Sequence, residues 1–176
     1  MKAEKTSVEY SNPYFDIVKK VFKSEAGKEY YYYMLEAPHD FVVVIAKKGD
    51  KILMTNQFRV PINCKSNEFV GGFINEGERF EDAAIRELRE EGGYIANVVT
   101  YMGKICPAVG KSSSRGYLYL ATCLEQTETD YDEFETFVGL ESFWKSEDEI
   151  GEMIRNGEII DSATLAAWCI YMEGDL

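Results

Sequence analysis

The chain has 176 residues, of which 45% are hydrophobic and 28% charged, and its formal net charge is -12 at pH 7. This length and composition are typical of one globular domain that is long enough to bury a core. The acidic balance argues against a nucleic acid as the main partner, because no basic stripe is available to displace counterions from a polyanion. No apolar run reaches the length of a membrane span, so we expect no membrane partner. A small phosphorylated metabolite that carries its own metal ion is compatible with this charge.

Residues 1–13 form a polar stretch that ends at Pro13 and contains no apolar signal core. We interpret this stretch as a polar leader without a secretion signal. The cysteines are far apart in sequence and show no CxxC spacing. They favour a reduced, cytoplasmic protein with buried thiols, and disulfides or zinc binding are the less favoured alternatives. The four cysteines are Cys64, Cys106, Cys123 and Cys169.

Two short β-prone stretches follow, at residues 14–22 and 29–35, and residues 25–28 between them are typical of a hairpin turn. Four consecutive tyrosines, residues 30–33, lie in the second stretch. Base stacking is one interpretation of such a run. Side chains alternate between the faces of a strand, however, so at most two tyrosines share a side, and packing is the better explanation.

Residues 41–46 form a continuous apolar run, which predicts a buried central strand, and residues 52–58 predict another. The single histidine, His39, directly precedes the first of these strands. Nucleophilic chemistry of the Ser-His or Cys-His type needs a histidine base. A turn residue at a strand start is the better interpretation of His39.

The most informative stretch runs from Gly72 to Tyr94 and contains a strongly helical segment over residues 80–91. Ala84 and Leu88 recur in this segment at helical spacing, so one side of the helix can face a core. The sequence therefore predicts an amphipathic helix here, entered from a glycine-rich turn.

Three carboxylates, Glu87, Glu90 and Glu91, occupy the other side of this helix about one turn apart. Like charges at this spacing cost a few tenths of a kcal/mol per pair on an exposed helix. A divalent cation offsets such repulsion, since Mg2+ is commonly held by one or two carboxylates together with substrate phosphates. The alternative is a solvated helix face on which Arg86 and Arg89 act as ion-pair partners.

The spacing of the whole stretch resembles the Nudix box, a glycine, five residues, a glutamate, seven residues and then Arg-Glu-apolar-x-Glu-Glu-x-Gly-apolar. Only Tyr94 is a soft match, because the pattern more often has an aliphatic residue there. The resemblance implies an α/β (α+β) protein, a Nudix-type α/β/α sandwich with a mixed β-sheet. The matching positions are Gly72, Glu78, Arg86, Glu87, Leu88, Glu90, Glu91, Gly93 and Tyr94.

The resemblance also implies roles for individual residues. Glu87 and Glu91, with help from Glu90 and the carbonyl of Gly71, would hold Mg2+, for which Mn2+ is a possible substitute. Arg86 would orient Glu87 through a charge-assisted hydrogen bond. Glu87 is also one of the candidates for the general base.

Two segments ahead of the box, residues 57–59 and 68–72, resemble the Gln-aromatic-Arg and Glu-x-Pro-Ala-Gly segments of the ADP-ribose pyrophosphatase branch. The second match is partial, because Val-Gly replaces Pro-Ala. In this branch Arg59 would contact substrate phosphate, and a surface ion pair is the alternative. Glu68 would be a further metal ligand or an acceptor behind the site. Pro107 fits the proline that this branch carries beyond the box.

Residues 95–105 and 116–124 read as strands that flank a polar loop. Ser112 and Arg115 in this loop are candidates for lining the substrate pocket. A plain polar loop is an equally good interpretation.

An acidic run covers residues 125–135 and, taken by itself, predicts a solvated loop. In the resembling branch a mobile loop in this region delivers a glutamate to the metal-bound water. Glu133 and Glu135 are the candidates, and the sequence does not choose between them. Residues 138–144 are then expected to form a strand.

Two helices are expected to close the chain. Ser146 and Glu149 form a capping-box pattern that predicts a helix through Arg155. A last helix over residues 162–172 carries an apolar stripe, for which core packing or a dimer contact is the better explanation. The stripe consists of Leu165, Trp168, Cys169 and Met172.

We therefore expect an N-terminal β-rich segment, residues 1–38, that packs on the domain or a partner subunit, and a Nudix hydrolase domain over residues 39–176. The resemblance implies Mg2+-dependent hydrolysis of a nucleoside diphosphate linked to another moiety, with ADP-ribose, giving AMP and ribose 5-phosphate, as the leading substrate. The alternatives are a nucleotide-sugar or dinucleoside polyphosphate hydrolase and a non-catalytic nucleotide-sensing domain. Members of the branch are commonly dimers, so a homodimer is expected.

Overall fold

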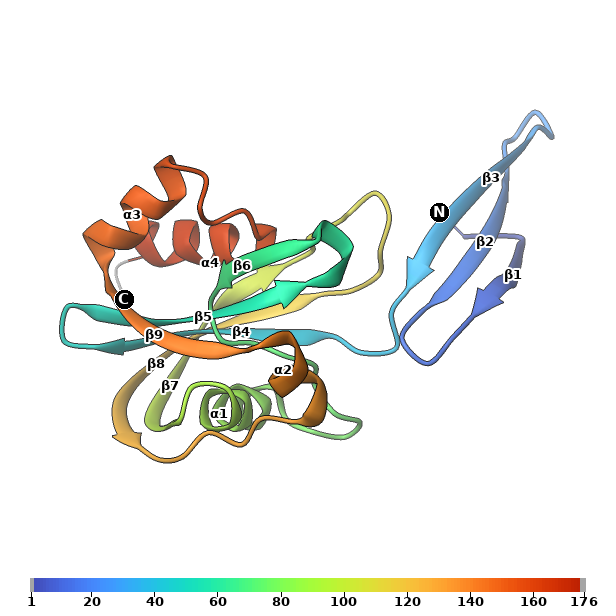
Figure 1. Cartoon of the computed structure of the whole chain (residues 1–176). Coiled ribbons are helices and arrows are strands. Elements are labelled where there is room, and N and C mark those ends of the chain that lie inside the picture. Colours follow the sequence, from blue (N-terminus) through green and yellow to red (C-terminus); the bar gives the residue numbers. More distant parts are fainter. Residues whose placement is uncertain (1, 175–176) are drawn as a thin grey trace.

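The computed structural model describes residues 2–174 and contains two separate β-sheets (Figure 1). The larger sheet has the strand order β6-β5-β4-β8-β7, and β9 pairs with β5 off this path. β4 and β8 run parallel, whereas the other pairs are antiparallel, so the sheet is mixed. Its strands are β4 (Phe41–Lys48), β5 (Lys51–Arg59), β6 (Cys64–Glu68), β7 (Tyr94–Ile105), β8 (Gly116–Gln126) and β9 (Glu141–Ser146).

Helices cover both faces of this sheet (Figure 1). Side chains alternate along β4, so that Val42 and Val44 pack in one buried core with Leu88 of the helix on that face. Val43 and Ile45 pack in the other core with the two C-terminal helices. The predicted α/β/α sandwich with a mixed sheet is confirmed. The helices are α1 (Phe80–Glu90) on one face, α3 (Glu147–Arg155) and α4 (Ser162–Glu173) on the other, and the short α2 (Glu133–Val138) beside α1.

The N-terminal residues form a three-stranded antiparallel sheet of β1 (Lys5–Ser11), β2 (Asp16–Lys23) and β3 (Glu29–Glu36). This sheet stands away from the sandwich (Figure 1). The expectation of a polar leader before Pro13 was wrong. Polar residues can fill β1 because it is an edge strand whose side chains remain largely exposed.

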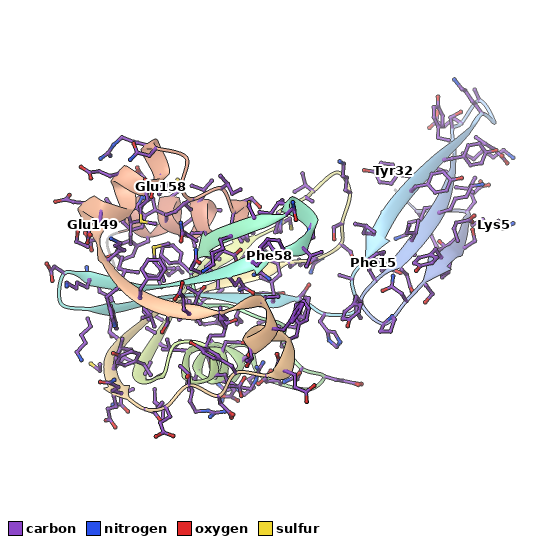
Figure 2. All side chains as sticks on the ribbon, in the orientation of Figure 1. Lys5, Phe15, Tyr32, Phe58, Glu149 and Glu158 are labelled. Carbon is purple, nitrogen blue, oxygen red and sulfur yellow. The ribbon has the colours of Figure 1, made fainter. Side chains whose placement is uncertain are left out.

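The N-terminal sheet contacts the sandwich through the loop between β7 and β8. The backbone amide of Leu35 donates to the carbonyl of Lys111 at 2.7 Å, and the amide of Ser113 donates to the carbonyl of Leu35 at 3.0 Å. The Tyr32 hydroxyl donates to the carbonyl of Gly110, and Figure 2 shows this ring projecting from β3 toward the sandwich. The division of the chain at residue 38 stays a prediction.

The tyrosines of β3 are exposed, with fractional exposures of 45% to 57%, so intramolecular packing does not explain the run. Their predicted alternation is present, because the ammonium of Lys19 lies over the rings of both Tyr31 and Tyr33, which share a face. The centroid distances are 4.7 and 5.7 Å. This face of the sheet is therefore aromatic, basic and open.

Other expectations need correction. The acidic run was expected to be a loop, but its last residues start α2. The strand that follows, β9, begins at Glu141 rather than at residue 138. β6 was not expected, because its five polar residues show no apolar alternation. The thiols were expected to be buried, yet all four cysteines are exposed.

In α4 the predicted stripe is only partly correct. Leu165 and Trp168 pack against the second core, whereas Cys169 and Met172 are exposed. The buried residues of this helix are small: Ala163, Thr164 and Ala167. Within residues 2–174 no helix combines the length and the apolar character that crossing a membrane requires.

Candidate functional site

The site lies where residues 70–73 run along β4 (Figure 1). β5 pairs with β4 only over its first residues, so the rest of this edge of β4 is free for the segment. The amide of Val44 donates to the carbonyl of Val70 at 2.8 Å, and the amide of Val42 donates to the carbonyl of Gly72 at 2.9 Å. These bonds fix the two glycines between β4 and α1.

Both glycines are required by close contacts. A Cβ atom at Gly72 would lie 2.3 Å from Oε1 of Glu87, and one at Gly71 would lie 2.4 Å from the carbonyl oxygen of Val42. No Cβ atom tolerates such distances without movement of its neighbour. The backbone of the segment can therefore approach the carboxylates of α1 only because side chains are absent here.

Glu87 and Glu91, one turn apart on α1, are buried, with fractional exposures of 7% and 5%. The amide of Gly71 donates to Oε2 of Glu91 at 3.1 Å, and Nη1 of Arg86 donates to Oε1 of Glu87 at 2.7 Å. Burial raises the pKa of Glu87 to about 7 and the pKa of Glu91 to about 8, and the charge of Glu87 adds to the effect on Glu91. Two desolvated carboxylates thus share one small volume, which is an arrangement that a cation stabilises.

Arg86 connects the parts of the site. Its Nε and Nη2 donate to the two carboxylate oxygens of Glu78 at 2.8 and 3.0 Å, and Nη2 also donates to the carbonyl of Phe73 at 2.8 Å. These hydrogen bonds, to Glu78 above all, raise the pKa of Arg86 and lower that of Glu78. Glu78 therefore braces the glycine segment through Arg86, and the geometry supports the predicted orientation of Glu87 by Arg86.

Glu90 lies differently from its neighbours. Its two oxygens accept hydrogen bonds from Arg86 at 3.0 Å and from Arg89 at 2.8 Å. In the part of the chain that the structure describes, no group of three or more acidic, cysteine or histidine side chains is arranged to hold a metal ion. Glu87 and Glu91 nevertheless supply the oxygen donors that Mg2+ prefers, and this ion normally completes its shell with waters and substrate phosphates. The donor set therefore fits Mg2+.

Of the two candidate glutamates in the acidic run, Glu135 is the one whose charge acts on the carboxylates of the site. Its charge contributes to the raised pKa of both Glu87 and Glu91, and burial raises its own pKa. Its Oε2 accepts a hydrogen bond from the amide of Asp132 at 2.7 Å in the capping box of α2. Glu133, at the first position of α2, is exposed.

A cavity of about 260 Å³ opens from the glycine segment. Arg59, Glu68, Gly71 and Pro107, all predicted from the sequence, line it. Nε of Arg59 donates to Oε1 of Glu68 at 2.9 Å, and Nη2 donates to Oε2, so the pair is bidentate. Glu68 is buried, which places it behind Arg59 as an acceptor.

Two predicted pocket residues lie outside this cavity. The hydroxyl of Ser112 accepts a hydrogen bond from the amide of Ser114, and the backbone of Ser112 pairs with the end of β3. Arg115 is exposed, and its amide donates to Oδ1 of Asp40 at 2.9 Å. The loop that contains both residues therefore anchors the N-terminal sheet in this structure.

The structure adds residues that the sequence did not indicate. The far end of the cavity is formed by Asp161 to Thr164 at the start of α4. Oδ2 of Asp161 accepts a hydrogen bond from the amide of Thr164 at 2.7 Å, so Asp161 is the N-cap of the helix. An aspartate directly before a helical segment signals an N-cap, but nothing local signals that the cap faces a site.

Fold and site together define a class: an α/β/α protein whose buried helical carboxylates and arginine-lined cavity suit a divalent cation and a phosphorylated ligand. A model of the NUDIX domain matches residues 35–168. The chain belongs to the Nudix family of hydrolases, and the predicted family is confirmed.

The relatives carry related names. The ADP-ribose pyrophosphatase of Bacillus subtilis (strain 168) is 30% identical over 130 residues, which cover 72% of this chain and 67% of that protein. The ADP-sugar pyrophosphatase of Mus musculus is 37% identical over 71 residues, covering 40% of this chain and only 33% of that protein. A crystal structure of an ADP compounds hydrolase matches this chain with a TM-score of 0.87 at 20% sequence identity. The match covers 98% of this chain and 92% of the chain in that crystal structure.

Proposed function

We propose that this protein hydrolyses the diphosphate of a nucleoside diphosphate linked to another moiety, with ADP-ribose, cleaved to AMP and ribose 5-phosphate, as the leading substrate. Mg2+ is the proposed cofactor and Mn2+ its substitute. The names of the relatives from B. subtilis and M. musculus support an ADP-linked sugar. The buried pair of Glu87 and Glu91, which hydrogen-bonds through Glu91 to Gly71 of the cavity that Arg59 lines, carries the proposal.

The metal would bind at Glu87 and Glu91. Both carboxylates are buried, and the Gly71 amide and the Arg86 guanidinium fix their positions. Bound Mg2+ would neutralise diphosphate oxygens and lower the pKa of the attacking water. Glu90 contributes less in this proposal, because Arg86 and Arg89 occupy its oxygens. The carbonyl of Gly71 stays a proposed further ligand.

The protein's own groups perform the remaining work. Arg59 binds a phosphate oxygen, and Glu68 holds its guanidinium in place. Glu135 accepts the proton of the attacking water as general base, which its place beside both metal-binding carboxylates favours over Glu133. A raised pKa also suits a carboxylate to proton transfer near neutral pH. Water attack and departure of the phosphate ester then release AMP and ribose 5-phosphate.

We also propose a homodimer. The tyrosine face of the N-terminal sheet is open, and large apolar side chains on exposed surfaces are typical of protein interfaces. Light scattering coupled to size-exclusion chromatography tests this with the whole chain, and a monomer at micromolar concentration would refute it. A cytoplasmic location stays a prediction.

Product analysis by mass spectrometry tests the function. Purified protein is incubated with ADP-ribose with and without Mg2+, and AMP with ribose 5-phosphate is expected only when the metal is present. UDP-glucose, GDP-mannose and diadenosine polyphosphates form the comparison panel. A clear preference for one of these would move the function to the nucleotide-sugar or dinucleoside alternative, and absence of turnover on all of them would favour a sensing domain.

A further inference from the structure

The cavity beside the carboxylates has two chemically different ends. One end contains Gly71 and Gly72, which contact Glu91 and Glu87, and the other contains Asp161 at the start of α4. Arg59 also lines this cavity. Its pKa is raised first by its hydrogen bonds to Glu68 and further by the charges of Glu91 and Asp161, so both carboxylates act on the same guanidinium.

Asp161 is one of the residues that line this cavity. Its Oδ2 accepts a hydrogen bond from the amide of Thr164, which satisfies the cap of α4. Among the residues that the structure describes, no hydrogen bond reaches Oδ1 of this half-buried side chain. The helix end is therefore already satisfied within the chain, and a cavity-lining residue keeps a second acceptor atom for a ligand.

This acceptor restricts what can bind next to it. An ionised carboxylate only accepts hydrogen bonds, and the diphosphate of a substrate is itself an anionic acceptor. The diphosphate is therefore drawn to Arg59 and repelled from Asp161. Among the groups of a sugar diphosphate that lie next to its phosphates, the sugar hydroxyls are the ones that can donate a hydrogen bond to Asp161.

Resting on the proposed function, we infer that Asp161 is a specificity-determining residue whose free oxygen accepts a hydrogen bond from a sugar hydroxyl of the substrate while Arg59 holds the phosphate. The enzyme thereby selects diphosphates that carry a hydroxylated sugar on the side that enters the cavity. A site that hydrogen-bonds a substrate hydroxyl discriminates strongly against an analogue without it, since the site's polar group is then left unpaired.

The test compares three substrates with the full-length protein and Mg2+. The first is ADP-ribose. The second is the propyl ester of ADP, in which a propyl group replaces the terminal ribose and its hydroxyls. The third is an ADP-ribose analogue whose adenosine lacks the 2′- and 3′-hydroxyls. Asp161→Asn is the informative variant. Asparagine is as good an N-cap as aspartate, so its side-chain oxygen can keep the Thr164 amide while an NH2 donor replaces the acceptor.

For the wild type, kcat/KM on ADP-ribose is expected to exceed that on at least one analogue by about tenfold or more, as for a hydrogen bond to a charged group. Asp161→Asn should remove most of this ratio. If Asp161→Asn lowers the ratio of kcat/KM on ADP-ribose to that on the propyl ester, Asp161 binds the terminal ribose. If it lowers the ratio to the dideoxy compound, Asp161 binds the ribose of the nucleoside.

Equal kcat/KM values of the wild type on all three substrates, or ratios that Asp161→Asn leaves unchanged, would overturn the inference alone. If the wild type cleaves none of the three substrates, the proposed function on which the inference rests would be overturned instead. Ser146→Ala is the matched control, because it removes the N-cap of α3 without touching the cavity. It should lower the melting temperature and leave the substrate ratios unaltered.

Discussion

The two ends of the cavity are built in different ways. The end that would hold the metal comes from one continuous stretch, residues 71–91, in which a glycine segment and a helix face each other. The other end combines β5, β6, Pro107 two residues after β7, and the start of α4. Site residues that come from one short stretch have a recognisable spacing in the sequence, whereas site residues that come from distant segments have none.

The difference suggests a division of labour. The continuous end should control turnover, because its carboxylates, its glycines and Arg86 hold one another in position through direct contacts. The composite end should control which substrate binds and how tightly. Variants at the two ends can therefore separate kcat from KM.

The largest effect is expected for Glu87→Gln. The substitution removes a buried metal-binding charge at nearly constant shape, so kcat should fall by about a thousandfold, as for loss of a main electrostatic group. AMP release from ADP-ribose measures it, and circular dichroism should show an intact fold. Glu90→Gln is the control and should cost much less, because Glu90 pairs with arginines. Near-wild-type activity of Glu87→Gln would refute the metal assignment.

Glu135→Gln should lower kcat by about a hundredfold or more, the usual contribution of a general base, with little change in KM. The neighbouring Glu133→Gln should retain activity, since Glu133 is exposed at the start of α2. Single-turnover kinetics at saturating Mg2+ compares the two. A larger loss in Glu133→Gln would reverse the assignment of the base.

Gly72→Ala tests how closely the glycine segment must approach α1. The added Cβ would meet the carboxylate of Glu87 at 2.3 Å, so that side chain must move. We expect kcat to fall about tenfold, as misplacement of a catalytic group by an ångström can cost up to a hundredfold. Stability should change less than kcat, because only the end of the Glu87 side chain must move, although this movement breaks its hydrogen bond from Arg86.

Gly49→Ala is the opposite case and serves as the control for Gly72→Ala. Gly49 has a φ of +64° in the β4–β5 turn, with open space around its Cβ position. Alanine should therefore cost about 1 kcal/mol of unfolding free energy from the left-handed backbone, without a loss of kcat at low temperature. If both variants lose stability equally and activity not at all, the contact with Glu87 has no catalytic role.

The sequence predicted α1 from its apolar spacing, β4 from a continuous apolar run, and the metal-binding carboxylates from the resemblance to the Nudix box. The structure buries α1 and β4 as these patterns predict. α2 was missed because its acidic residues resemble a solvated loop, although Asp132 and Glu135 carry a capping-box spacing. The place of Asp161 was not predictable, because its role in the cavity depends on how α4 packs against the sheet.

The smallest effect is expected for Glu68→Gln at the composite end. Glu68 holds the Arg59 guanidinium through two hydrogen bonds, and loss of its charge loosens the residue that binds phosphate. KM should rise about fivefold with kcat nearly constant, which corresponds to about 1 kcal/mol of uniform binding. Glu141→Gln, which breaks the exposed ion pair with Lys65 beyond the cavity, should change neither constant. A fall in kcat with an unchanged KM would instead make Glu68 a metal ligand, and the two ends of the cavity would then share the work of catalysis.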